Sequence, residues 1–327
     1  MEHQIRFPHL GIVLKNVGDG INIGGFEIKY YGMIIATGFL LGLIVSYYAA
    51  KHENKFDPEL VFDYLITMII PAIVGARLYY VIFSWDYYKN HLSEIIQIRN
   101  GGLAIYGGVI AGAITLYIFC KKKHLSMLQF GDVAVKGLLV GQILGRWGNF
   151  FNREAFGSYT NSLFAMQIPT NFFIEHGRID EIVSNGLYDK ATYVVSGNEA
   201  ATFIQVHPTF LYESLWCAGL FIILFLYRKH KKYEGELFLM YLFGYGAGRV
   251  WIERLRTDQL VLPEIGFPVS ELLAGCLVIV TGIMLIYCRR HCRKRNEKKK
   301  VDQYEPVPTK IKGKKPPKWD DRLFKNR

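Results

Sequence analysis

The sequence carries little charge for its length and lacks the usual marks of metal or nucleotide chemistry. Charged residues make up 20% of the 327 residues, whereas hydrophobic residues make up 51%. The five cysteines show no metal-site spacing, and most lie in apolar runs, which indicates small buried side chains. No glycine-rich phosphate-binding loop is present. We therefore expect no metal and no other cofactor, and the apolar composition excludes an ordinary soluble enzyme.

The net charge of +11 is formally compatible with nucleic-acid binding, but its distribution argues against a nucleic-acid partner. The basic residues gather in short segments beside apolar runs and near the C-terminal end, a pattern typical of membrane proteins. Met1–Asn22 lacks a basic start followed by an apolar stretch, so we expect no cleavable signal peptide. The first spanning helix would then direct insertion into the membrane.

Seven apolar windows approach the roughly 20 residues that a helix needs to cross a hydrocarbon core. They are Tyr30–Ala50, Phe62–Phe83, Leu103–Cys120, Val133–Leu144, Pro208–Tyr227, Phe238–Ile252 and Glu271–Cys288. The fourth window is short and contains Lys136, and the sixth ends in charged residues. We therefore expect these two helices to be surrounded by other helices of the protein and not by lipid. The pattern predicts an all-α integral membrane protein with seven transmembrane helices.

The loops between these windows predict the orientation of the chain. The segments KHENK, KKKH, RKHKK and RRHCRKRNEKKK follow the first, third, fifth and seventh windows. Because Lys and Arg accumulate in cytoplasmic loops, these segments should face the cytoplasm. The N-terminus is then extracytoplasmic and the C-terminus cytoplasmic, which agrees with an odd number of spans.

This topology divides the chain into a membrane-embedded catalytic domain, 1–290, and a basic tail, 291–327. Residues 145–207, between the fourth and fifth spans, should form a small extracytoplasmic subdomain. The tail has few apolar residues and alternating charge, so we expect it to be disordered on the cytoplasmic side.

The stretch GRWGNFFNREAFG, 145–157, places a polar cluster at the outer end of the fourth window. Arg146 offers a rigid fork of donors that suits a phosphate, and Asn149 and Asn152 add neutral donors without competing charge. An alternative is that the arginine only reaches the membrane interface and pairs with lipid phosphate or Glu154. With these neighbours beside it, we favour a functional site, because ionisable groups at membrane depth usually serve one.

A second cluster, GYGAGRVWIERLRTD, 244–258, closes the sixth window on the same side. Arg249, Glu253 and Arg256 fall on one stripe of a helix. One interpretation is a structural ion pair between Arg249 and Glu253. The other is a second phosphate-binding arginine held by the glutamate, so that two helices together bind an anionic lipid headgroup.

Three further segments lie at or near the same side. GGLAIYGG places Tyr106 between two pairs of glycines. Tyr106 either packs at the membrane interface as an aromatic belt residue, or its hydroxyl acts in the site as a hydrogen-bond donor or a base. Tyr31, at the start of the first window, is expected to anchor the helix at the interface. HPTFLYES carries Glu213 two turns inside the fifth window, where a carboxylate needs a partner. Arg77, late in the second window, is a candidate for that ion pair.

These motifs together resemble the prolipoprotein diacylglyceryl transferase family. GRWGNFFNREAFG meets every fixed position of the family signature, roughly G-R-x-G-N-F-x-N-x-E-x-x-G, and the order of YYG, GARLYYV, GGLAIYGG, HPTFLYES and GRVWIERLRTD also agrees. The resemblance covers about residues 25–290. It implies a bacterial enzyme of the cytoplasmic membrane with seven spans and an outward-facing active site. Its substrates would be phosphatidylglycerol and the lipobox segment of a preprolipoprotein signal peptide.

The resemblance implies transfer of a diacylglyceryl group to the lipobox cysteine thiol, which forms a thioether and releases glycerol phosphate. It implies that Arg146 and Arg249 bind the lipid phosphate. Positions important in the family correspond to Tyr31, Asn149, Glu154, Gly157 and Glu253, and we add Asn152 and Tyr106 as site residues.

Tyr106 departs from the family pattern, because many members carry a histidine there that has been proposed as the base. A neutral tyrosine, with a pKa near 10, is a poor acceptor for a thiol proton unless nearby arginines lower its pKa. Glu154 and Glu253 are alternative bases, and a thiol with a lowered pKa would need little base.

Two other functional classes compete with a transferase. A seven-span transporter or flippase would be expected to show inverted repeats or broken helices at corresponding positions, and the sequence shows neither. A seven-span receptor is the third class. The sequence does not support it, because the charged residues are concentrated in two clusters at one membrane level.

Overall fold

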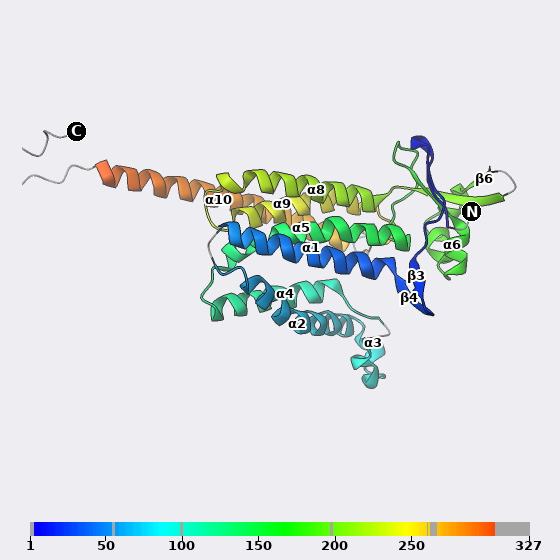
Figure 1. Cartoon of the computed structure of the whole chain (residues 1–327), viewed down its shortest axis with the longest axis horizontal. Helices are drawn as coiled ribbons and strands as arrows, with labels where there is room; N and C mark the ends of the chain where they lie inside the picture. The colour runs from blue at the N-terminus through cyan, green and yellow to red at the C-terminus, as the bar shows by residue number, and fades with distance from the viewer. Residues whose placement is uncertain are drawn as a thin grey trace, which may run out of the picture.

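The protein is a bundle of long helices with a small sheet-containing part at one end (Figure 1). The computed structural model describes residues 3–53, 56–98, 101–196, 199–259, 261 and 267–304. We call the end of the bundle that carries the larger sheet the sheet end. The long helices of the described chain are α1 (Tyr30–Glu53), α2 (Leu60–Phe83), α4 (Ile105–Lys122), α5 (Met127–Asn152), α8 (Thr209–Tyr227), α9 (Glu236–Glu253) and α10 (Val269–Tyr304).

Each of the seven predicted windows falls on one of these helices, with only Leu103, Ala104 and Pro208 preceding the helix start. Six of the helices are long and apolar enough to cross a membrane. The protein is therefore a mostly helical, multi-pass membrane protein. The remaining helix, α9, has 18 residues and contains Glu236, Arg249 and Glu253. These charges lower its hydropathy, and the side chains are held in ion pairs with neighbouring helices or within α9.

Glycines allow the helix pairs α1–α5 and α2–α4 to approach closely. A methyl group on Gly42 of α1 would lie 2.5 Å from the carbonyl oxygen of Gly137 on α5. A methyl group on Gly75 of α2 would lie 2.7 Å from the carbonyl oxygen of Gly107 on α4. Small residues at such crossings let backbones touch, which is how helices associate within lipid. α5 also packs against α8 and α9, so it is a central helix of the bundle.

The sheet end contains a five-stranded antiparallel sheet in the order β2-β1-β5-β7-β6. Its strands are β1 (Ile5–Phe7), β2 (Ile12–Leu14), β5 (Met166–Pro169), β6 (Thr192–Ser196) and β7 (Glu199–Val206). The predicted subdomain at 145–207 is therefore incomplete, because two strands come from the N-terminal segment. The prediction also begins it too early, since α5 continues to Asn152. A purely all-α description omits this sheet.

A hydrophobic core joins the sheet to the end of α5. Ile5 of β1, Ile168 of β5 and Ile204 of β7 are fully buried against Phe150 of α5 and neighbouring aromatic rings. Short elements complete this end of the molecule. They are the hairpin strands β3 (Gly20–Ile23) and β4 (Phe26–Lys29), the helices α3 (Trp85–Tyr88), α6 (Thr170–Glu175) and α7 (Ile179–Val183), and the 3-10 turns η1 (Pro8–Leu10), η2 (Leu92–Ile96) and η4 (Tyr188–Lys190).

The opposite end of the bundle carries the basic segments and a buried charge network. Lys136 of α5 pairs with Glu53 of α1, and Lys231 pairs with both Glu53 and Asp132. The lysine that weakened the fourth window is thus neutralised inside the protein. Asp132 also accepts the backbone N–H groups of Gly235 and Phe238, at 2.9 Å each, and so caps the start of α9.

Past the last window, α10 continues as a helix to Tyr304, so the first part of the predicted tail is helical. Residues 305–327 of the predicted disordered tail lie outside the described residues.

Candidate functional site

Two arginines from different helices meet one buried carboxylate near the sheet end of the bundle. Nη2 of Arg146, on α5, lies 2.5 Å from Oε2 of Glu213, on α8. Nη1 of Arg249, on α9, lies 3.3 Å from the same oxygen. Glu213 is buried, whereas both arginine side chains keep about a fifth of their surface exposed. The expected convergence of Arg146 and Arg249 is therefore present, and Glu213 joins them.

Further ion pairs surround this junction and bring it close to electrical neutrality. Arg249 also reaches Oε2 of Glu253 at 2.7 Å, one turn along α9. Arg256 lies 3.6 Å from Glu213 and donates two hydrogen bonds to Asp258, at 2.9 and 2.7 Å. Three arginines thus face three carboxylates. The charges of the junction therefore nearly cancel.

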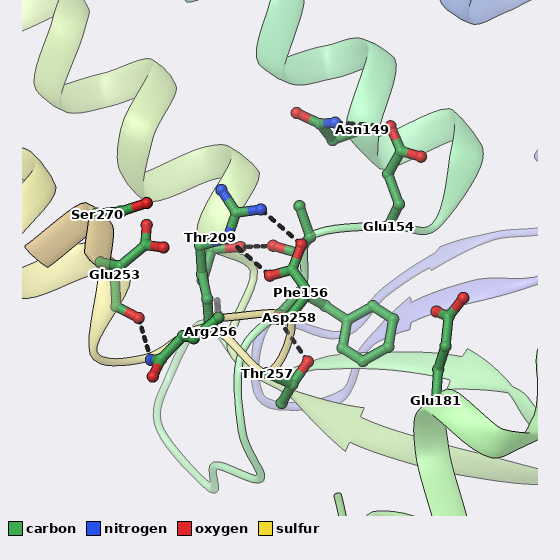
Figure 2. Close-up of polar contacts among 12 residues, drawn as sticks. Asn149, Glu154, Phe156, Glu181, Thr209, Glu253, Arg256, Thr257, Asp258 and Ser270 are labelled. Carbon is green, nitrogen blue, oxygen red and sulfur yellow. Dashed lines mark hydrogen bonds and ion pairs between the residues drawn. The ribbon is translucent and has the colours of Figure 1, made fainter. Parts of the chain in front are cut away.

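The last turn of α5 presents the amide of the signature, Asn149, and the turn after the helix presents its carboxylate, Glu154. Asn149 Nδ2 donates to Glu154 Oε1 at 2.7 Å (Figure 2). The residues that flank Glu154, Arg153 and Ala155, both have left-handed backbone, with φ of 48° and 55°. This conformation is costly for a residue with a side chain and persists only where surrounding contacts hold it. Thr209 of α8 donates to the Ala155 carbonyl and supplies one such contact.

Arg153 supplies more of these contacts and does not reach the surface. Its guanidinium lies 4.1 Å from the centre of the Phe172 ring and donates to the carbonyls of Val17 and Phe151. Burial lowers the pKa of Arg153 to about 10. It therefore ties the N-terminal segment, the end of α5 and α6 together at the signature turn.

Gly157 and Gly148 of the signature occupy crowded positions. A methyl group on Gly157 would lie 2.7 Å from the Leu255 carbonyl oxygen and from Cβ of His207. Gly157 also forms a β-bridge with Arg256, which links the signature to the segment after α9. A methyl group on Gly148 would lie 2.9 Å from the Tyr31 ring. These contacts explain why glycine stands at both positions, and they place Tyr31 against the last turns of α5.

Tyr106, at the start of α4, makes a hydrogen bond to the start of α10. Its hydroxyl lies 2.9 Å from Oγ of Ser270, near the start of α10. Its ring lies 6.4 Å from that of Tyr79 on α2. Tyr106 therefore links two helix starts at the sheet end, and the residue is partly exposed.

Asn152 lines a small pocket of about 270 Å³ at the end of the signature helix. Asp19, Lys29 and Tyr31 form one side of this pocket, and α6 with the turn after it forms the other. The Asn152 backbone carbonyl accepts a hydrogen bond of 2.9 Å from Arg178. Among the described residues, no group of three or more His, Cys, Asp or Glu side chains is arranged to hold a metal ion.

The interpretation of Arg77 as the partner of Glu213 is wrong. Arg77 is buried on α2 and donates to the backbone carbonyls of Glu94, Ile95, Gly101 and Gly102, at 2.7 to 2.9 Å. It thereby organises the segment between α2 and α4. Its position at the end of an apolar helix gave no indication of backbone partners in a loop further along the chain.

Sequence reasoning left Glu213 and Arg256 out of the predicted site. A glutamate two turns inside an apolar helix was a sufficient signal that Glu213 needs cationic partners. Arg256 shares a stripe with Arg249 in the sequence, but its contact with Glu213 depends on the approach of α8 to α9.

The pKa values of two groups at the edge of the site are shifted. Burial lowers the pKa of His207, at the start of the segment leading into α8, so the neutral ring is favoured. Burial acts to raise the pKa of Asp258, but hydrogen bonding and attraction to Arg256 outweigh it and lower the pKa. The pair of Asp258 and Arg256 therefore stays ionised.

These features define a class of protein: a multi-pass membrane protein whose helices deliver arginines and carboxylates to one end of the bundle, beneath a small sheet. The chain belongs to the prolipoprotein diacylglyceryl transferase family, which it matches over residues 20–288.

The chain is also similar to curated proteins named phosphatidylglycerol–prolipoprotein diacylglyceryl transferase. It is 39% identical to that of Listeria innocua over 269 residues, which are 82% of this chain and 88% of the relative. It is 39% identical to that of Finegoldia magna over 278 residues, 85% of this chain and 98% of the relative. The protein of Trichormus variabilis is 38% identical over 276 residues, 83% of this chain and 89% of the relative.

Proposed function

We propose that this protein transfers the diacylglyceryl group of phosphatidylglycerol to the lipobox cysteine thiol of a preprolipoprotein. Family membership and the names of the relatives support the reaction. The observation that carries the assignment of the site is the convergence of Arg146 and Arg249, from two helices, on Glu213.

The thiolate attacks the glycerol carbon that bears the phosphate ester, a C–S bond forms and the C–O bond breaks. The electron pair stays on the leaving glycerol phosphate, whose charge grows from about −1 toward −2, and the thiol proton passes to a base. Arg146 and Arg249 would stabilise this growing charge more than the ground state, and that difference lowers the barrier.

Glu213 would hold the two guanidinium groups in place before the lipid arrives. Preorganised donors cost no reorganisation during the reaction. Glu253 would restrain Arg249, and Asn149 and Glu154 would face the substrate from the end of α5. Tyr31, Asn152 and Gly157 would shape the headgroup side of the site, and Tyr106 would contact lipid or acceptor beside Ser270.

We further propose seven membrane spans, an extracytoplasmic N-terminus and an active site that faces outward from the bacterial cytoplasmic membrane. The basic segments after α1, α4 and α8 and within α10 support this orientation, since they lie at the bundle end opposite the sheet (Figure 1). Lysine and arginine favour the cytoplasmic side. The polar cluster near the sheet end would then meet the outer leaflet.

The test uses the purified full chain, labelled phosphatidylglycerol and a lipobox peptide in detergent. The wild-type protein should move the label to the peptide, and Arg146→Ala should lose about 10²–10³ in rate or more. Lys89→Ala, which removes an exposed cation on the segment after α3, should retain the wild-type rate. Absence of label transfer by the wild type would disprove the reaction, and a wild-type rate for Arg146→Ala would disprove the role of Arg146.

A further inference from the structure

The segment between the N-terminal strands and α1 is a small two-stranded ribbon that stands apart from the larger sheet. β3 and β4 pair only with each other. Gly24 and Gly25 join them, with φ of 60° and 87°. Positive φ at both central residues is typical of the tight hairpin turn whose twist matches that of the strands.

The ribbon separates apolar from polar side chains. Ile21 pairs with Ile28, and Ile23 pairs with Phe26, so these four side chains share one face because residues two apart in a strand point the same way. Asn22 and Glu27 pair on the other face. We call the four-residue surface the apolar ribbon face.

The apolar ribbon face is exposed along its whole length. The exposed fractions are 39% for Ile21, 62% for Ile23, 80% for Phe26 and 42% for Ile28. Two-stranded ribbons are at best marginally stable in water, and contiguous exposed apolar patches usually mark an interaction surface. Something apolar must therefore cover this face in the working protein.

The attachment of the ribbon indicates what covers it. β4 ends at Lys29, and α1, a candidate membrane span, starts at the next residue, Tyr30. Tyr30 N donates to the Asp19 carbonyl at 2.9 Å, and Lys29 Nζ lies 2.8 Å from Asp19 and 2.6 Å from Glu27. The ribbon base is thus fixed at the end of a lipid-facing helix, and its charges are kept off the apolar ribbon face. Figure 1 shows the ribbon at the sheet end of α1.

We propose that the ribbon lies in the membrane–water interface, with the apolar ribbon face among lipid acyl chains and the Asn22–Glu27 face toward the headgroups and water. An amphipathic element with an apolar face beside a polar one suits this boundary. If the function proposed above holds, the ribbon also fixes the depth of the active site, because Tyr31 follows it directly and packs on Gly148 beside Arg146.

The first test measures the position of the ribbon without reference to catalysis. Nitroxide labels are attached at Phe26→Cys, Asn22→Cys and Val195→Cys, in a full-length background whose five native cysteines are replaced, in phosphatidylglycerol–phosphatidylcholine vesicles. Val195 is the matched control, because it is 63% exposed but lies on β6, at the far edge of the larger sheet. The label at Phe26 should be accessible to oxygen and shielded from a water-soluble nickel chelate, and the other two should show the reverse.

Two results would overturn the proposal. Nickel accessibility at Phe26 equal to that at Val195 would place the apolar ribbon face in water. Shielding from both reagents that increases with protein density would show that a second copy of the chain covers it.

The second test asks whether the ribbon matters for lipid presented as a bilayer. Ile23→Asp combined with Phe26→Asp should raise the apparent KM for phosphatidylglycerol in vesicles severalfold, with kcat in detergent unchanged. Val195→Asp should change neither value. An unchanged KM in vesicles would remove the role in setting depth. If the wild type transferred no label at all, the function proposed above would fail, and the nitroxide measurement would still decide the ribbon's location.

Discussion

Arg146 on α5 and Glu213 on α8 form an ion pair with 2.5 Å between Nη2 and Oε2, and the pair joins two helices between which the sequence places three strands, β5, β6 and β7. The glutamate also meets Arg249 and Arg256, so a single buried carboxylate opposes three guanidinium groups. A carboxylate shared in this way determines the positions of the arginines as well as their charge balance.

Removal of the Glu213 carboxylate should destabilise the protein more than removal of another buried glutamate. Glu213→Ala removes the carboxylate that pairs with Arg146, whereas Arg249 keeps Glu253 and Arg256 keeps Asp258. An uncompensated buried charge typically costs about 3–5 kcal/mol. Glu271 is equally buried, but its partner Arg254 is largely exposed and can be hydrated. Thermal unfolding in detergent should therefore show a larger fall in midpoint for Glu213→Ala than for Glu271→Ala. Equal shifts would mean that Glu213 is an ordinary ion-pair partner.

The Tyr106 hydroxyl should matter through more than its bond to Ser270. We expect Tyr106→Phe to lose more transfer activity than Tyr106→His, because a histidine can still donate or accept a proton. Ser270→Ala removes only the hydrogen-bond partner and should cost less than Tyr106→Phe. A double-mutant cycle with initial rates separates the two contributions. Equal activity of Tyr106→Phe and the wild type would exclude a role for the hydroxyl.

Arg153 and His124 give a matched pair of backbone substitutions. Both have left-handed φ, 48° and 53°, after a helix, so glycine relieves on the order of 1 kcal/mol at either position. His124→Gly, at an exposed site after α4, should raise or maintain the unfolding midpoint and leave transfer unchanged.

Arg153→Gly should lower the midpoint instead. It removes the guanidinium that contacts Phe172, Val17 and Phe151, and this loss should exceed the backbone relief. A higher midpoint for Arg153→Gly would mean that the buried side chain adds nothing to stability.

His207 should make the protein less stable at mildly acidic pH. Burial lowers its pKa in the folded protein below the usual value near 6.5, so the unfolded chain binds the proton more readily. The stability contributed by the neutral ring is complete above pH 6.5, and it is lost as the pH falls from 6.5 through the lowered pKa of the folded protein. The unfolding midpoint of the wild type should therefore fall more between pH 7.5 and 5.5 than that of His207→Gln. Parallel curves for the two proteins would contradict this expectation.

The sequence by itself determined the long helices and the local proximity of the signature residues. Apolar windows locate all seven long helices, because the length and hydropathy of a spanning segment are local properties. The signature residues Arg146, Asn149 and Glu154 are close in the chain, so their proximity follows from one helix end and the turn after it.

The tertiary structure decided which distant groups meet. Hydropathy could not indicate that Glu213 pairs with Arg146 instead of Arg77, because that choice depends on α8 packing beside α5. Nor could it indicate that β1 and β2 complete a sheet with residues 166–206, since strand pairing across the chain is set by a shared core. The local sequence pattern determines whether a segment forms a spanning helix. The packing of distant segments against one another determines which charged side chains form ion pairs.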